Sequence, residues 1–144
     1  MIELSRLYQI AEEENIEVDC FDLKKREALS TMDDDGACYI AIDPYKLHST
    51  PEERTKLAHE LGHCITGSFY NANATVEHRQ RHENCADKWA IKKLIPVDEL
   101  ETAAATGCTE IWELAEHFGV TEQFMKKAVC YYAHGNLATE LYFY

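Results

Sequence analysis

The spacing of apolar positions changes along the first third of the chain. Between residues 2 and 15 they recur at close to helical intervals, and this stretch ends in an acidic cluster. Residues 16–23 alternate, and two further strand-like runs, 26–32 and 37–43, flank a turn signal at 33–36 (DDDG). The pattern predicts a helix followed by a strand and a hairpin, which form a small sheet of about three strands.

A longer helix is predicted directly after the sheet. Thr50 is a suitable N-cap, Pro51 fits the first helical turn, and Glu53 completes a capping box. The helix should therefore begin near Pro51 and end near Gly67. Two of its faces differ in character: one stripe holds Leu57, Leu61, Cys64, Ile65 and Ser68, and the other holds Lys56, His59, Glu60 and His63.

The second half of the chain is predicted to be helical after one polar loop. Residues 68–80 predict a loop, because they are polar and show no periodicity. Apolar residues then return at helical intervals until Pro96 ends the segment. The pattern predicts helices at about 82–96, 97–105, 109–117 and 121–135, and the aromatic tail 136–144 is expected to pack back onto the body.

The composition is that of a soluble globular protein of one domain. The chain has 144 residues, 46% of them hydrophobic and 28% charged, and no apolar run approaches the roughly 20 residues of a membrane span. The N-terminus lacks the basic start, apolar stretch and cleavage site of a secretory signal. We therefore expect a cytoplasmic protein that does not enter a membrane.

Six cysteines are scattered along the chain without a Cys-x-x-Cys pair. Without an export signal, this distribution favours reduced and mostly buried thiols over disulfides. A cysteine that acts as a metal ligand or nucleophile is the alternative, and Cys64, beside His63, is its first candidate.

The formal net charge of -12 bears on the partners of the protein. Such a charge repels phosphate backbones at long range, so nucleic acid is not expected as a direct partner. A basic protein is a more natural one.

Two histidines four residues apart in the predicted helix are the main chemical signal. His59 and His63 project from one helical face, roughly 6 Å apart, so both imidazoles can bind one zinc ion. Glu60 lies beside that face and is placed to take a proton from an attacking water. The alternative is an ordinary helix whose histidines form a solvated polar patch.

A catalytic zinc needs a third protein ligand. The candidates downstream are Glu77, His78, His82, Glu83 and Asp87. Glu83 is preferred because it opens the next predicted helix and is followed one turn later by Asp87, which could accept the second ring N–H of a ligand histidine. The alternatives are that Glu83 only stabilises a helix N-terminus and that Asp87 only pairs with Lys88 or Lys92.

The spacing of His59, Glu60, His63, Glu83 and Asp87 resembles the gluzincin arrangement. The wider text, "GACYIAID", "KLAHELGHCITG" and "ENCADKWAIKKLIP", resembles the ImmA/IrrE family of metallopeptidases. This resemblance implies a cytosolic zinc peptidase of phages and mobile elements. Its protein partner would be a helix-turn-helix repressor, which it cleaves.

Two points are not determined by the resemblance. The polar loop from Tyr70 to Arg81 looks like an insertion that reshapes the substrate groove, and the residue that stabilises the oxyanion is left open among Tyr70, His82 and His134. A non-catalytic zinc-binding module, a regulator of the toxin-antitoxin or anti-repressor kind, is the alternative function.

The segment "LAEHFGVTEQFMKKAV" has the look of a helix-turn-helix. Between residues 110 and 130 four glutamates face two lysines, which favours protein docking or a structural role over DNA binding. We therefore predict an α+β, zincin-like fold in which a small N-terminal sheet packs on a helical body. Residues 1–105 would form the peptidase domain, and residues 106–144 a helix-turn-helix-like extension packed on it as part of a single compact domain.

Overall fold

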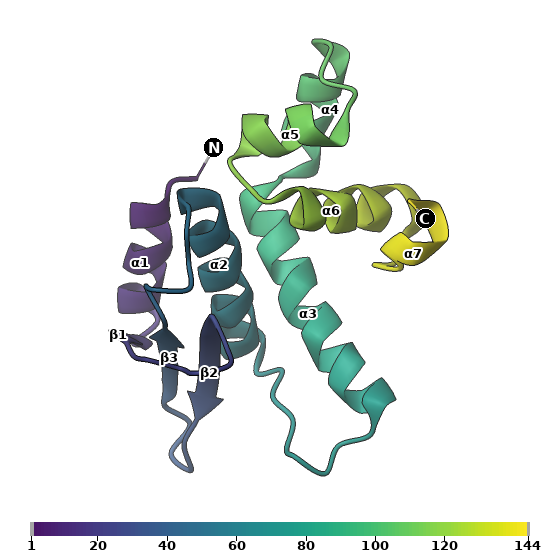
Figure 1. The fold of residues 1–144 in the computed structure, drawn as a ribbon. Helices are drawn as coiled ribbons and strands as arrows, with labels where there is room; N and C mark the ends of the chain where they lie inside the picture. The colour runs from purple at the N-terminus through teal and green to yellow at the C-terminus, as the bar shows by residue number, and fades with distance from the viewer. Residues whose placement is uncertain (1, 144) are drawn as a thin grey trace.

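The computed structural model describes residues 2–143 and has the predicted α+β architecture (Figure 1). A three-stranded sheet lies on the N-terminal side of the molecule, and helices form the rest. Within the described residues the elements are α1 (Leu4–Glu13), β1 (Glu17–Cys20), β2 (Ala28–Met32), β3 (Cys38–Ile42), α2 (Thr50–Thr66), α3 (Val76–Leu94), α4 (Val97–Ala105), α5 (Ile111–Phe118), α6 (Glu122–His134) and α7 (Thr139–Tyr142).

The sheet has the order β1-β3-β2 and mixes two kinds of pairing. β1 runs parallel to the central strand β3, whereas β2 and β3 form the predicted antiparallel hairpin. Ile40 and Ile42 of β3 are buried in the core that the sheet shares with α2. β2 lies at an edge of the sheet, next to α2, and this edge becomes important at the candidate site.

Helix α2 lies between α1 and α3 (Figure 1). Its N-cap is Ser49, which accepts a hydrogen bond from the backbone N–H of Glu52, and not Thr50 as predicted. The Glu52 side chain in turn accepts from the N–H of His48, so the predicted involvement of Glu53 is also displaced by one residue. Gly67 ends the helix in the left-handed conformation, with φ of 67°.

The apolar face of α2 is buried mostly as predicted. Leu57 and Leu61 are fully buried, and Ser68 is buried just beyond the helix. Ile65 was expected on the same stripe, but its side chain is exposed at the far end of the helix. The two residues that matter most for packing are therefore those in the middle of α2.

Helices α2 and α3 approach each other closely at Gly62. A Cβ atom at this position would lie 2.5 Å from the carbonyl oxygen of Ala86 and 3.0 Å from its Cα. Only glycine fits there without moving a backbone. This contact sets the spacing between the two helices that carry the candidate metal ligands.

The predicted loop at 68–80 is too long. Helix α3 already begins at Val76, where the Thr75 side chain accepts a hydrogen bond from the N–H of His78. The first turns of α3 are exposed, so they carry no apolar face for a periodic pattern to reveal. An N-cap residue, and not hydrophobic spacing, determines where this helix starts.

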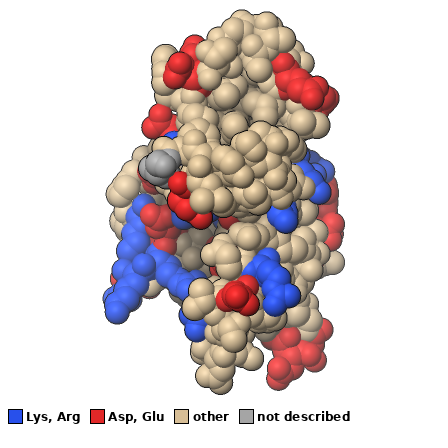
Figure 2. Space-filling model, turned by 90° about the vertical axis from the view of Figure 1, so that its right-hand side faces the viewer, with Lys and Arg blue, Asp and Glu red and all other residues tan. Residues whose placement is uncertain are grey.

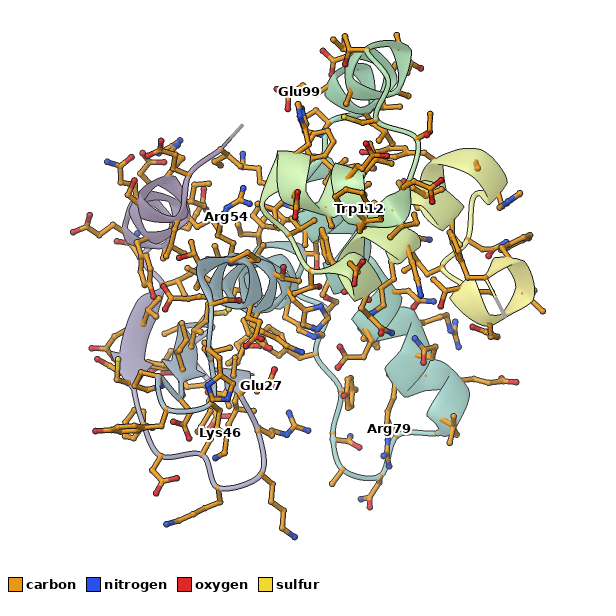
Figure 3. All side chains as sticks on the ribbon, turned by 45° about the horizontal axis from the view of Figure 1, so that its top comes forward. Glu27, Lys46, Arg54, Arg79, Glu99 and Trp112 are labelled. Atoms are coloured by element: carbon orange, nitrogen blue, oxygen red, sulfur yellow. The ribbon has the colours of Figure 1, made fainter. Side chains whose placement is uncertain are left out.

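Among the C-terminal helices, α6 packs against α3, and α5 and α7 each contact α6. Helices α5 and α6 lie where the sequence predicted two helices joined by a turn at Gly119, and Thr121 caps α6. Arg54 of α2, which is buried, donates hydrogen bonds to the carbonyls of Phe118 and Gly119 and to that of Ile2. Figure 3 shows Arg54 between α1 and α5, where it ties the α5–α6 turn to the body.

The tail was expected to pack through its aromatic residues. It forms the short helix α7, which contacts α6, and the Tyr142 ring stacks on His134 at 3.7 Å. Tyr144, included in that expectation, lies outside the described residues. Cys20 and Cys85 are exposed although most thiols were expected to be buried. In the stretch 2–143, no helix has the length and apolarity that a bilayer crossing requires.

Candidate metal centre

The structure brings His59, His63 and Glu83 together. The two histidines come from consecutive turns of α2, and Glu83 comes from the facing side of α3. Glu83 Oε2 lies 2.7 Å from His59 Nε2 and 3.1 Å from His63 Nε2. Within the described part of the chain, these three residues are the group of metal-ligating side chains whose donor atoms cluster, all within 4.8 Å of one another.

The outer nitrogens of both rings are held by acceptors. His59 Nδ1 donates to Asp87 Oδ1 at 2.7 Å, and His63 Nδ1 donates to the backbone carbonyl of Ser68 at 2.5 Å. Since neither acceptor can donate, the Nδ1 atoms carry the protons. In the neutral rings the Nε2 lone pairs therefore face Glu83, as metal ligation requires.

The chemistry of this donor set fits a metal ion. Two imidazole nitrogens and one carboxylate oxygen are the protein ligands of a common catalytic zinc site, which leaves one position open. Donor atoms around a zinc with bonds of about 2.1 Å lie roughly 3–4 Å apart. The distances from Glu83 Oε2 to the two Nε2 atoms, 2.7 and 3.1 Å, lie at or just below that spacing, and the whole group spans up to 4.8 Å. Small rotations of the Glu83 carboxylate and of the histidine rings would therefore admit the ion.

Without a metal, the group behaves as a compact ion cluster. Burial opposes charge on His59, but hydrogen bonds to Asp87 and Glu83 outweigh it and raise its pKa to about 9. Burial also opposes charge on Glu83 and Asp87, yet the same hydrogen bonds to His59 keep the pKa of each carboxyl below its usual range. A metal ion bound here would replace the proton on His59 and keep both carboxylates charged.

Glu60 lies beside this group and is held by a residue that the sequence did not single out. The Glu60 side chain is buried, and one of its oxygens accepts a hydrogen bond of 2.7 Å from Ser30 Oγ in β2. Ser30 therefore connects the edge strand to the predicted general base. Ser30 carries little sequence signal for this role, because a serine in a short strand is usually expected to face solvent.

The three candidate oxyanion donors are in different places. Tyr70 donates to Glu83 Oε1 at 2.8 Å, so its hydroxyl lies at the metal group. His82 contacts His78, with 3.2 Å between their Nε2 atoms, and its ring is 6.3 Å from that of Tyr70. His134 stacks on Tyr142 at the end of α6. The geometry therefore favours Tyr70.

The alternatives raised for Asp87 do not match its environment. Its side chain is buried, and its second oxygen accepts from Lys127 Nζ of α6 at 3.1 Å. Lys88 and Lys92 instead lie near the ring of Tyr131. Sequence reasoning missed Lys127 and the Ser68 carbonyl, because both contacts depend on how distant segments fold together.

Two hollows meet at the candidate site. The larger, about 530 Å³, lies on the His59 side and is lined by residues of α2, α3 and α6, including Lys56, Asp87 and Lys127. The smaller, about 270 Å³, lies along β2 and is lined by Ser30, Glu60, His63 and Tyr70, among others. Glu83 lines both, so a segment of extended chain could pass across the three candidate ligands.

Comparison with known proteins agrees with this geometry. No curated protein gives a significant match to the chain. The family model Peptidase_M78, described as an IrrE N-terminal-like domain, matches residues 11–129. The match covers β1 to α6 almost completely, and so includes the two-histidine helix, the facing Glu83 and the helix that carries Lys127. The chain therefore belongs to the IrrE N-terminal-like family of metallopeptidases, as the resemblance to ImmA/IrrE proteins predicted.

Proposed function

We propose that the protein is a zinc-dependent endopeptidase that cleaves a helix-turn-helix repressor of a phage or mobile element in the cytoplasm. The observation that carries the proposal is the position of Glu60. This carboxylate is buried beside the group of His59, His63 and Glu83 without being part of it. A carboxylate that only bound the metal would belong to the group itself, and one that only stabilised the helix would not need to lie beside the group.

Different residues around the group can take the separate roles that peptide hydrolysis requires. A zinc ion held by His59, His63 and Glu83 would polarise the scissile carbonyl and activate a water near neutral pH. Glu60 accepts a proton from the attacking water and passes it to the leaving amine, while Ser30 holds the carboxylate in place. The Tyr70 hydroxyl, which lies at Glu83, is the side chain best placed to donate to the developing oxyanion.

The edge strand gives the site a way to bind a protein substrate. β2 pairs with β3 along one side, and its residues Leu29, Ser30 and Thr31 line the smaller hollow. An extended substrate segment can add to such an edge through main-chain hydrogen bonds. This mode selects unfolded or loop segments of a protein, which suits an endopeptidase.

The test separates catalysis from metal binding. Wild type and the Glu60→Gln variant would be loaded with zinc and incubated with each helix-turn-helix protein encoded beside the gene, and cleavage would be followed by mass spectrometry. Loss of a general base typically slows turnover by about a hundredfold to ten-thousandfold, so Glu60→Gln should bind zinc and partner but leave the partner uncut. Glu53→Gln is the matched control, because it makes the same change on α2 beside Tyr8, away from the metal group.

The outcomes discriminate between the two classes of function. Cleavage by Glu60→Gln at the wild-type rate would show that Glu60 is not the base. If wild type and variant both bind a partner tightly and neither cuts it, the protein is a binding module and the proposal fails.

A further inference from the structure

Lys127 connects the C-terminal extension to the metal centre. Lys127 lies on α6, 40 residues after Asp87 in the sequence, and its Nζ atom is 3.1 Å from Asp87 Oδ2. The other Asp87 oxygen accepts from His59 Nδ1 at 2.7 Å. One carboxylate thus bridges a candidate metal ligand and a lysine of a different structural element.

We infer that Lys127 is a positioning residue of the metal centre, which acts through Asp87 to hold the His59 ring in its metal-binding orientation. This inference rests on the proposed function only for the presence of a metal at His59, His63 and Glu83. It adds that the helix-turn-helix-like extension controls how tightly the site holds its metal.

The burial of Asp87 explains why the lysine matters. The Asp87 side chain is 8% exposed, so water is a poor substitute for a missing partner at Oδ2. With Lys127 in place, both oxygens are paired and the carboxylate plane is fixed by contacts from two sides. Without it, Oδ2 is left without its donor and the carboxylate can turn toward another donor, so the hydrogen bond that orients His59 becomes weaker.

The position of Lys127 is itself well defined. Arg54 holds the carbonyls of Phe118 and Gly119, which lie just before α6. Thr121 caps the first turn of α6, and Met125 and Ala128 on either side of the two lysines are fully buried. α6 therefore approaches α3 in a fixed register, and the Lys127 amine reaches the same hollow that His59, Glu83 and Asp87 line.

The test measures metal affinity and not only activity. Zinc dissociation constants would be obtained by competition with a chelator, and the visible spectrum of the Co²⁺-loaded protein would report the ligand geometry. Lys127→Met should weaken zinc binding roughly tenfold, at the lower end of the effect of removing an outer partner of a metal ligand, and should change the Co²⁺ spectrum. Lys127→Arg should restore both to near wild type. Lys92→Met, which removes the same charge from α3 near Tyr131, should change neither.

A double-mutant cycle tests the route through Asp87. If Lys127 acts on the metal through this carboxylate, Lys127→Met should change zinc affinity by less than about twofold in an Asp87→Asn background. An equal loss in both backgrounds would overturn the route. A lower unfolding temperature of the metal-free Lys127→Met protein, together with unchanged zinc affinity, would show a purely structural role and overturn the inference.

The results also keep the two proposals apart. A wild-type chain that binds zinc and responds to Lys127→Met as expected, but cuts no partner, contradicts the proposed function alone. A wild-type chain that cuts its partner, together with a Lys127→Met variant that binds zinc as tightly as wild type, contradicts the inference alone. A wild-type chain that takes up no zinc overturns both.

Discussion

At the scale of single residues, two carboxylates decide the charge of His59. Burial disfavours the charged ring, yet the hydrogen bonds to Asp87 and Glu83 raise its pKa to about 9 in the metal-free protein. The ring of an unfolded chain titrates near its ordinary value, about 6.5. Since the folded pKa is the higher one, the charged ring stabilises the fold fully below about pH 6.5, and this contribution is lost as the pH rises through 9.

We predict that the metal-free protein becomes less stable between about pH 6.5 and pH 9.5. The expected loss attributable to His59 is on the order of 1–3 kcal/mol, since its interactions are shared with Glu83 and Asp87. Urea unfolding in the presence of a chelator would measure it at both pH values. His59→Asn removes the titrating ring, so the variant should lose clearly less stability over the same interval; an equal loss would mean that other groups cause the pH dependence.

At the scale of secondary-structure elements, the spacing of α2 and α3 depends on one glycine. A methyl group at Gly62 would lie 2.5 Å from the carbonyl oxygen of Ala86, and a backbone atom of a helix cannot move aside as a flexible side chain can. In an isolated helix, replacing glycine by alanine stabilises by roughly 0.5–1 kcal/mol. Here the steric conflict should reverse the sign.

Gly62→Ala should therefore destabilise the protein by about 1–3 kcal/mol, as overpacked cores typically do. Because His59 and His63 lie on α2 and Glu83 on α3, separation of the two helices should also weaken zinc binding. Thermal unfolding and zinc titration of the variant check both effects. A more stable variant would show that the helices are free to separate without cost, which would contradict the close packing described above.

The sequence predicted most of these elements but not all of their boundaries. Where a helix faces the core, as α2 does through Leu57 and Leu61, the apolar period is visible and its ends are found within a residue. Where a helix projects into solvent, as in the first turns of α3, its residues show no apolar period, and the sequence therefore predicts a loop there. The start of α3 is signalled by the Thr75 cap, a one-residue feature that polar surroundings obscured.

The residues of the candidate site also fall into those that the sequence predicted and those that it missed. His59 and His63 lie four residues apart on one helix, so their proximity follows from helical geometry, and Glu83 and Asp87 were suggested by their own one-turn spacing. Ser30 and Lys127 come from a strand and a helix whose packing on α2 and α3 no local pattern reveals. Residues that depend on tertiary packing were therefore the ones missed.

At the scale of the whole molecule, charge is distributed unevenly along the chain. The segment from Val97 to Met125 contains no lysine or arginine, and its acidic residues are Asp98, Glu99, Glu101, Glu110, Glu113, Glu116 and Glu122. In Figure 2 the upper end of the molecule, which α4 and α5 form, shows acidic side chains on a largely uncharged surface. The basic side chains in this view lie mainly below it.

This distribution bears on the helix-turn-helix-like pair α5–α6. A DNA reader of this type places its second helix in the major groove and its first across the phosphates, so it needs positive charge around the turn. Here the exposed residues Glu116 and Glu122 flank the turn, next to the exposed Trp112 labelled in Figure 3. The net charge of -12 adds repulsion at longer range.

We predict no salt-sensitive binding of the protein to duplex DNA at physiological ionic strength. The segment 97–125, which contains the turn, has no lysine or arginine to release counterions from the phosphates, and Arg54 beside the turn is buried. Fluorescence anisotropy with a labelled duplex at low and physiological salt would measure the binding. The variant Glu116→Lys/Glu122→Lys tests the reason: if charge is the obstacle, it should gain weak binding that decreases as salt rises. Sub-micromolar, salt-dependent binding by the wild-type chain would contradict this prediction and identify α5–α6 as a DNA-binding unit despite its charge. The partner to look for would then be operator DNA and not a repressor protein.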